Sequence, residues 1–168
     1  RAIEIAARTG LPLKIAAKID RADQAYWRET IEPLVRAHPN VEYVGEINER
    51  QKQTFLANAS ALLFPIDWEE PFGLVMIEAM ACGTPVVAFR AGSVPEVIDH
   101  GQSGFIVTDM NEAVAAVELA MELPRAGVRA VFDARFTARR MASDYVDIYR
   151  ASAARRRIAA SEVQAIAV

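Results

Sequence analysis

The sequence has little of several features that define broad protein classes. It has a single cysteine, Cys82, so no internal disulfide can form, and this fits a reducing compartment such as the cytoplasm. No apolar run is long enough to cross a bilayer. Basic residues are not in excess, because 19 Lys and Arg against 22 Asp and Glu give a formal net charge of −3. This balance argues against general nucleic-acid binding.

The chain has enough apolar residues for one folded domain. It is 168 residues long and 52% hydrophobic, which is sufficient for a substantial core. No internal repeat, low-complexity segment or linker is visible. The sequence begins with Arg1 rather than Met and enters a helical pattern at once, so we expect a fragment of a longer protein.

Short apolar segments alternate with helical patterns along the chain. The expected strands are residues 13–17, 41–44, 61–64, 86–89 and 105–107. The expected helices are residues 1–9, 24–37, 48–58, 73–82, 93–99, 111–123, 125–134 and one that starts near 137. The expected N-caps are Asp23, Asn48, Ser93, Asn111 and Thr137, and Ser93 with Glu96 forms a capping box. This alternation predicts an α/β fold with a Rossmann-like, doubly wound parallel sheet. Ligands of such sheets bind beyond the carboxyl ends of the strands.

A carboxylate in an apolar helix marks the most informative stretch, which reads D-W-E-E-P-F-G-L-V-M-I-E-A-M-A-C from Asp67 to Cys82. The helix is apolar on nearly every face and is therefore expected to be buried, yet it carries Glu78. No Lys or Arg lies within one helical turn of Glu78. A buried carboxylate needs a partner or a ligand, so we expect either a ligand or an ion pair with a distant arginine such as Arg90.

Glu70 stands where the strand at 61–64 gives way to this helix. The first amides of the helix, those of Phe72, Gly73, Leu74 and Val75, are orphan donors and form an anion site. Two carboxylates that accept hydroxyls, beside amides that hold phosphate, fit a sugar nucleotide. The alternative for Glu70 is a solvated charge beside Asp67 and Glu69. We expect no metal site, because one short acidic turn seldom supplies enough converging oxygens.

The motif around these residues resembles a known enzyme family. E-P-F-G-L-V-M-I-E-A-M-A-C-G-T-P-V-V-A, in which Glu70 and Glu78 form an E-x7-E pair, followed by G-S-V-P-E, looks like the signature of retaining GT-B glycosyltransferases of family four. The likeness extends from Val41 to Val107, and the C-terminal helix with Tyr145 and Tyr149 also resembles the family's. The resemblance implies that residues 1–168 are the C-terminal, donor-binding half of a GT-B fold, with the acceptor domain absent.

The resemblance also implies roles for the site residues. Glu78 would bind the ribose hydroxyls of the donor, and Glu70 would be the catalytic residue that faces hydroxyls of the transferred sugar. Phe72, Gly73, Leu74 and Val75 would complete the donor site. The whole enzyme would transfer a hexose from a UDP- or GDP-sugar to an unknown acceptor with retention and without metal or cofactor. Ser93 departs from the family, which often has a second glycine there.

Two other functions compete with this one. The first is a nucleotide-sugar epimerase, whose fold is related, although the P-F-G turn with two glutamates speaks against it. The second is a non-catalytic sugar-nucleotide sensor or an assembly domain. The run Arg155-Arg156-Arg157 predicts a solvated helix end, and its alternative is weak peripheral attraction to an anionic membrane. The oligomeric state is not encoded in any pattern we find.

A strand of the family's sheet is missing from the sequence. In the family, a strand that ends in G-R and a later K-G pair supply basic contacts to the donor diphosphate, and neither pair occurs here. The fragment alone is therefore expected to lack transferase activity. The absent strand would be the central one in the order 3-2-1-4-5-6, between residues 13–17 and 61–64. Upstream residues, a partner chain or the alternating tail Glu162 to Val168 would fill its place.

Overall fold

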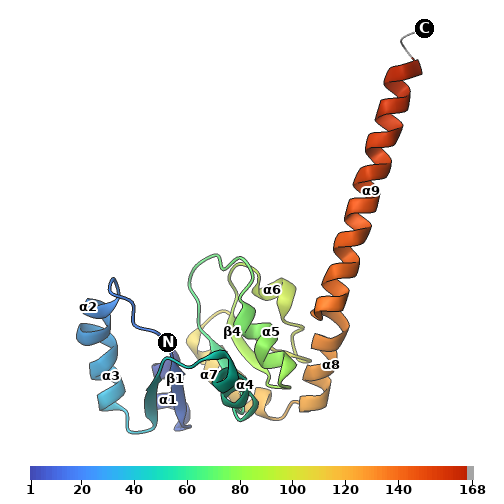
Figure 1. Ribbon diagram of the computed structural model, residues 1–168. Helices are drawn as coiled ribbons and strands as arrows, with labels where there is room; N and C mark the ends of the chain where they lie inside the picture. Colours follow the sequence, from blue (N-terminus) through green and yellow to red (C-terminus); the bar gives the residue numbers. More distant parts are fainter. Residues whose placement is uncertain (166–168) are drawn as a thin grey trace. The chain divides into compact units, whose positions relative to one another are not determined.

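The computed structural model describes the backbone of residues 1–165 and the side chains of residues 1–155 (Figure 1). The chain forms two compact units, Arg1–Val131 and a second that begins at Phe132. The first unit holds all the strands. Each unit is described here by itself.

The first unit contains the five expected strands, and all of their pairings are parallel. They are β1 (Leu13–Ala16), β2 (Val41–Gly45), β3 (Leu62–Phe64), β4 (Val86–Phe89) and β5 (Gly104–Val107). The helices are α1 (Ala2–Thr9), α2 (Gln24–Tyr26), η1 (Trp27–Ile31), α3 (Glu32–Ala37), α4 (Glu49–Ala57), α5 (Leu74–Ala81), α6 (Val94–Val97), α7 (Met110–Met121) and α8 (Arg125–Arg135). The predicted α/β class with a parallel sheet is confirmed.

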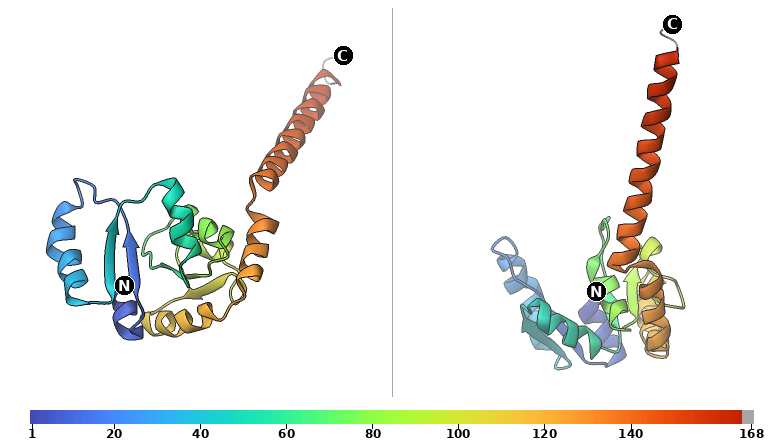
Figure 2. Two further views of the ribbon diagram at one scale, coloured as in Figure 1. Left: turned by 60° about the horizontal axis from the view of Figure 1, so that its bottom comes forward. Right: turned by 45° about the vertical axis from the view of Figure 1, so that its right-hand side comes forward.

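The sheet is split into two parts. β1 pairs with β2, and β4 lies between β3 and β5 (Figure 2, left view, where β1 and β2 are the blue and teal arrows). Among the described residues β1 and β3 do not pair. This agrees with the expected strand order, which places another strand between them. The burial of the strands reflects this split, because every residue of β4 is buried whereas Leu62, Leu63 and Phe64 of β3 are only half-buried.

Helix α1 packs against both parts of the sheet. Ile5 belongs to the apolar cluster formed by β4, β5 and α7, which also contains Val87 and Val107. Ile3 and Ala6 belong to a second cluster with Val41 of β2. One amphipathic helix of eight residues therefore joins the two sheets through two of its faces.

The expected helix over 24–37 is interrupted. Residues Trp27–Ile31 form a π-helical segment between two short α-helical pieces, and α3 carries Pro33 in its first turn. Proline has no amide hydrogen and cannot donate to the carbonyl four residues earlier, so the preceding turn widens. The predicted cap by Asp23 is wrong, since its side chain makes no capping bond. The predicted cap by Asn48 is confirmed, as a full capping box with Gln51. The predicted cap by Asn111 is wrong, because α7 begins at Met110 and Asp109 is its N-cap, with a side chain that accepts the amides of Asn111 and Glu112.

The predicted capping box at Ser93 is wrong. A capping side chain needs an extended backbone, but Ser93 has right-handed helical angles (φ −74°, ψ −9°). Its own carbonyl accepts the amides of Glu96 and Val97 at 2.9 and 3.0 Å, so the amide that its hydroxyl should bind is already used. The Ser93 hydroxyl is buried, and it finds no hydrogen-bond partner within the described part of the chain.

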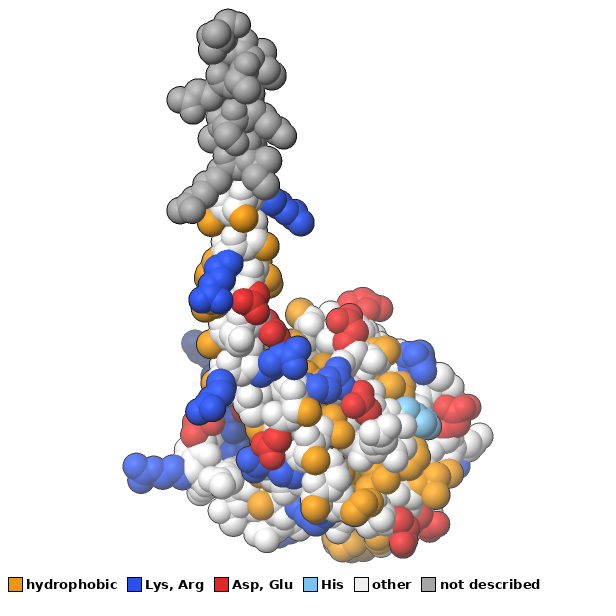
Figure 3. All heavy atoms as spheres, turned by 90° about the vertical axis from the view of Figure 1, so that its right-hand side faces the viewer, with side chains coloured by type: hydrophobic (Ala, Val, Ile, Leu, Met, Phe, Trp, Pro, Cys, Tyr) orange, Lys and Arg blue, Asp and Glu red, His pale blue; other side chains and the backbone are white. Residues whose placement is uncertain are grey.

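The second unit is dominated by one long helix, α9 (Ala138–Ala165). Thr137 caps it as predicted, since its hydroxyl accepts the amide of Arg140 at 3.3 Å. Apolar side chains and arginines both lie along its described part (Figure 3). The arginine run 155–157 lies inside α9, and beyond Arg155 its side chains are outside the described residues. The tail Glu162 to Val168 is helical as far as Ala165, and its last three residues also lie outside them. No described helix has the length and apolarity needed to span a membrane.

Two buried hydroxyls allow a matched test of this packing. Thr84 is fully buried, donates to the carbonyl of Leu56 at 2.7 Å and accepts from Arg125 at 2.8 Å. Thr84→Val keeps the shape but removes both of these hydrogen bonds, so we expect a loss of about 1–3 kcal/mol in the free energy of unfolding. Ser93→Ala removes a hydroxyl that has no partner, so we expect no loss of stability. Urea denaturation measures both, and a clear destabilisation by Ser93→Ala would contradict the described environment of its hydroxyl.

Candidate functional site

The candidate site lies at the carboxyl end of β3, where residues 65–73 form a turn into α5. Gly73 is the N-cap of α5 and has a left-handed backbone (φ +72°). A Cβ at this position would lie 2.7 Å from the Met76 methyl group and 3.2 Å from the Phe64 ring. Glycine is therefore required for the chain to turn this tightly into the helix.

The Glu70 carboxylate is held by two neutral donors. Its Oε1 accepts the amide of Gly73, and its Oε2 accepts the indole N–H of Trp68, each at 3.1 Å. Glu70 is half-buried, whereas Asp67 and Glu69 are exposed. A free solvated charge does not describe Glu70, because its carboxylate caps the positive end of α5.

The first amides of α5 differ in their availability. The amide of Gly73 already donates to Glu70. Those of Leu74 and Val75 have no acceptor among the described residues. The set of orphan donors is therefore smaller than predicted, because the Gly73 amide is already used. The amides of Leu74 and Val75 are the two that remain available to an anion.

Helix α5 is not buried on all sides, which corrects the expectation from its apolar sequence. Met76, Ala79 and Met80 are fully buried, but Leu74 is 64% exposed. An all-apolar helix does not reveal which of its faces the chain covers. Glu78 lies toward the open face, where its side chain is 33% exposed.

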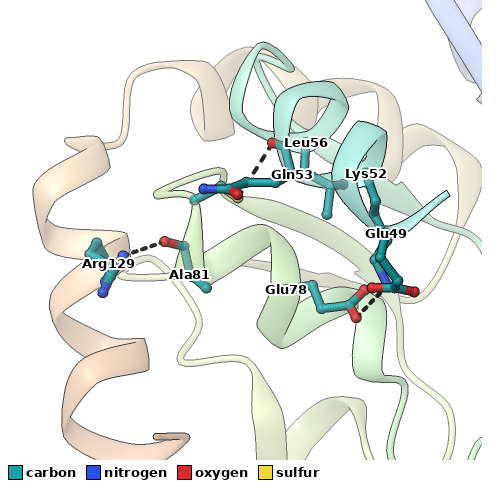
Figure 4. A pocket seen from close by; sticks show the side chains of 8 residues that line it. Glu49, Lys52, Gln53, Leu56, Glu78, Ala81 and Arg129 are labelled. Atoms are coloured by element: carbon teal, nitrogen blue, oxygen red, sulfur yellow. Dashed lines mark hydrogen bonds and ion pairs between the residues drawn. The ribbon is translucent and has the colours of Figure 1, made fainter. Parts of the chain in front are cut away.

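Glu78 forms an ion pair with Lys52 of α4. The Lys52 ammonium lies 2.7 Å from Glu78 Oε1 and 3.0 Å from Glu49. The hydrogen bond to Glu78 and then the one to Glu49 raise the pKa of Lys52. The expected arginine partner, for which Arg90 was the example, is wrong. The pair lies at the rim of a hollow of about 290 Å³ between α4 and α5 (Figure 4).

Two backbone turns interlock beside Glu70. The Glu70 carbonyl accepts the amide of Ser93 at 2.9 Å, and the Glu69 carboxylate accepts the amide of Gly92 at 2.9 Å. Gly92 has φ +48°, and a Cβ on it would lie 2.3 Å from the carbonyl oxygen of Glu70. The turn after β4 thus fixes the position of Glu70 by direct backbone contact.

Within the described residues, no group of three or more His, Cys, Asp or Glu side chains could hold a metal ion.

Comparison with known families is consistent with this geometry. The family model for glycosyl transferases group 1 matches residues 28–135. The chain belongs to this family. The curated proteins that it matches include a D-inositol 3-phosphate glycosyltransferase of Saccharomonospora viridis, 43% identical over an alignment of 101 residues that covers 56% of this chain and 23% of that protein. A glycogen synthase of Mycobacterium tuberculosis is 34% identical over 105 residues, which are 61% of this chain and 24% of that protein. The chain thus spans less than a quarter of the length of either relative.

Solved structures show the same fold. A sucrose-phosphate synthase from Thermosynechococcus elongatus superposes with a TM-score of 0.74 at 29% identity, covering 91% of this chain and 42% of that one. HepE from Anabaena, solved with UDP and glucose, gives a TM-score of 0.71 at 22% identity, covering 89% of this chain and 44% of that one. The described chain therefore has the α/β architecture of half of a GT-B glycosyltransferase.

Sequence reasoning missed three residues of this site. Lys52 is 26 positions from Glu78, so a search within one helical turn of Glu78 does not reach it. The bond from Trp68 to Glu70 is not among the predictions, although the position of Trp68 two residues before Glu70 is a local signal for it. Gly92 was noted for its place in the motif, but its contact with Glu70 links turns that are 22 residues apart and has no signal in a single sequence.

The interlocked turns give a matched pair of glycine substitutions. Gly101 also has a left-handed backbone (φ +79°), but a Cβ there would meet nothing within 4 Å. Gly101→Ala should lose only the conformational term, about 1–2 kcal/mol. Gly92→Ala carries that loss and also forces Cβ into the Glu70 backbone, so we expect a further about 1–3 kcal/mol. Urea denaturation compares the two variants, and equal losses would contradict the interlock.

Proposed function

We propose that this chain is the donor-binding domain of a retaining glycosyltransferase of family four. The whole protein would transfer a hexose from a UDP- or GDP-sugar to an acceptor bound by another domain, without a metal ion. The observation that carries the proposal is the end of α5, where two carboxylates, Glu70 and Glu78, flank the available amides of Leu74 and Val75. Membership of the group 1 family supports it.

The charges of the site suit each part of such a donor. The N-terminal end of α5 carries a partial positive charge, and its two available amides suit the diphosphate. A carboxylate suits neighbouring hydroxyls, because each oxygen accepts more than one hydrogen bond. We assign Glu78 to the ribose and Glu70 to the transferred sugar.

Catalysis would rest on stabilising the departing diphosphate. Negative charge grows on the leaving diphosphate as the bond to the sugar breaks, and donors already aimed at that position lower the barrier without reorganising. The amides of Leu74 and Val75 fit this role. The curated proteins that are similar to this chain include a glycogen synthase and a D-inositol 3-phosphate glycosyltransferase, so transfer of a sugar is the chemistry that we propose here too.

We also propose that a further strand occupies the space between β1 and β3. Unpaired strand edges inside a fold leave backbone donors and acceptors unsatisfied, and both strands have one such edge within the described residues.

We propose a cytoplasmic location for the protein, because it has one cysteine and a nucleotide-sugar donor is proposed for it. Weak contact of the α9 arginines with an anionic membrane surface is an additional proposal.

The role of Glu78 is tested by nucleotide affinity. Glu78→Ala removes the proposed acceptor of the ribose hydroxyls, and a hydrogen bond to a charged group contributes about 1.5–3 kcal/mol. We expect binding of UDP or GDP to weaken about tenfold or more. Glu78→Gln keeps the shape and removes the charge. Isothermal titration calorimetry measures both, and unchanged affinity in a folded variant contradicts the ribose assignment.

The role of Glu70 is tested by separating binding from turnover. Glu70→Ala should leave the affinity for free UDP or GDP near that of the wild type, because the sugar is absent from these ligands. Turnover of the UDP- or GDP-hexose by the full-length protein should fall, and it is assayed in buffer with EDTA since no metal is proposed. If Glu70→Ala and Glu78→Ala lose affinity for the free diphosphate equally, the division of roles is wrong. If wild-type turnover is absent while the nucleotide binds, a non-catalytic sensor is favoured.

A further inference from the structure

Lys52 connects two helices at the edge of the candidate donor site. Its ammonium bonds Glu78 on α5 at 2.7 Å and Glu49 on its own helix at 3.0 Å. The Lys52 and Glu78 side chains are 27% and 33% exposed, whereas the Glu49 side chain is 86% exposed. The contact with Glu78 is thus the more protected of the two, and Figure 4 shows the Lys52 and Glu78 side chains pointing toward one another between α4 and α5, at one side of the hollow.

The pair is not needed to hold α4 in place. The C-terminal end of α4 is fixed by the Thr84 hydroxyl on the carbonyl of Leu56 and by Arg125 on the carbonyls of Ala57 and Ala59. Its first turn is stabilised locally by the capping box of Asn48 and Gln51. The two side chains of the pair are still about a third exposed, and ion pairs that keep contact with solvent contribute little to stability. A role in orienting Glu78 therefore explains the contact better than a role in folding.

The hydrogen-bond geometry leaves Glu78 able to bind a ligand while paired. Lys52 occupies one acceptor position of Oε1, and no bond to Oε2 occurs among the described residues. A carboxylate has about four acceptor positions, so neighbouring hydroxyls find sites beside the ammonium. Without Lys52, the flexible Glu78 side chain would lose rotamer freedom when ligand binds, and affinity would fall.

We propose that Lys52 is a positioning residue that holds the Glu78 carboxylate ready for the ribose hydroxyls of the donor nucleotide. This inference rests on the proposed function, because it assigns a role within the same site. Lys52 acts through Glu78 and makes no contact with the nucleotide itself. Its removal should therefore matter only while Glu78 is present.

The test is a double-mutant cycle read by calorimetry with UDP and with GDP. Lys52→Met keeps the aliphatic stem and removes the charge, and we expect affinity for the bound nucleotide to fall about three- to tenfold. In the Glu78→Ala background the same change should alter affinity less than about twofold. Lys52→Arg keeps a cation at this position and should recover most of the affinity.

A matched control shares the chemistry of the pair but not its place. Lys14 is an exposed lysine 3.3 Å from Glu42 on β2, outside the candidate site, and Lys14→Met makes the same change in net charge. It should leave nucleotide affinity unchanged. If Lys52→Met does not fold, as judged by circular dichroism, Lys52→Gln replaces it in the cycle.

Each remaining outcome overturns the inference in a distinguishable way. Unchanged or tighter binding by Lys52→Met would mean that the lysine is idle or competes with ribose. Losses that add in the double variant would mean that Lys52 contacts the nucleotide directly. If the wild type binds neither UDP nor GDP, the proposed function fails together with this inference. If it binds one of them but Lys52→Arg binds like Lys52→Met, only the inference fails.

Discussion

The contact between the backbones of Gly92 and Glu70 is the constraint on which the candidate site depends. It brings the turn after β4 against the turn after β3, with the Ser93 amide on the Glu70 carbonyl. No residue with a Cβ fits at position 92 without moving Glu70. Because Glu70 is fixed in this way, its carboxylate reaches the Gly73 amide and closes the end of α5. The geometry of the site is thus set by main-chain contacts, and the side chains are arranged on them.

The two parts of the sheet, β1-β2 and β3-β4-β5, are connected through helices that pack on them. Helix α1 places Ile5 in one apolar cluster and Ile3 in the other. Arg125 donates to carbonyls at the ends of α4 and α5, where helix carbonyls lack partners and the dipole favours a cation. These contacts link the parts of the fold around the site, although β1 and β3 do not pair within the described residues.

Local patterns predicted the fold well, and long-range contacts set the limit. The strands and most helices follow from apolar segments and caps such as Asn48, whose partner lies three residues away. Glu70 and Glu78 are candidate site residues because of their motif, and their roles stay a prediction. The errors have two causes. Some contacts depend on residues that are distant in the sequence, and some caps depend on backbone angles. The Lys52 partner of Glu78 comes from another helix, and the cap at Ser93 failed because its backbone angles do not follow from its sequence motif.

The two carboxylates differ in a way that bears on how a donor would be read. Glu78 is paired with a cation, so attraction between opposite charges adds to its hydrogen bond with Lys52. Glu70 is held only by an amide and an indole, of which the Trp68 side chain is exposed and free to turn away. Under the proposed function, a ribose hydroxyl would join Glu78 beside Lys52, and a sugar hydroxyl would join Glu70 at the acceptor positions that Gly73 and Trp68 leave open. The first carboxylate suits a group bound in every donor complex, and the second suits a group whose contact forms only when the sugar is present.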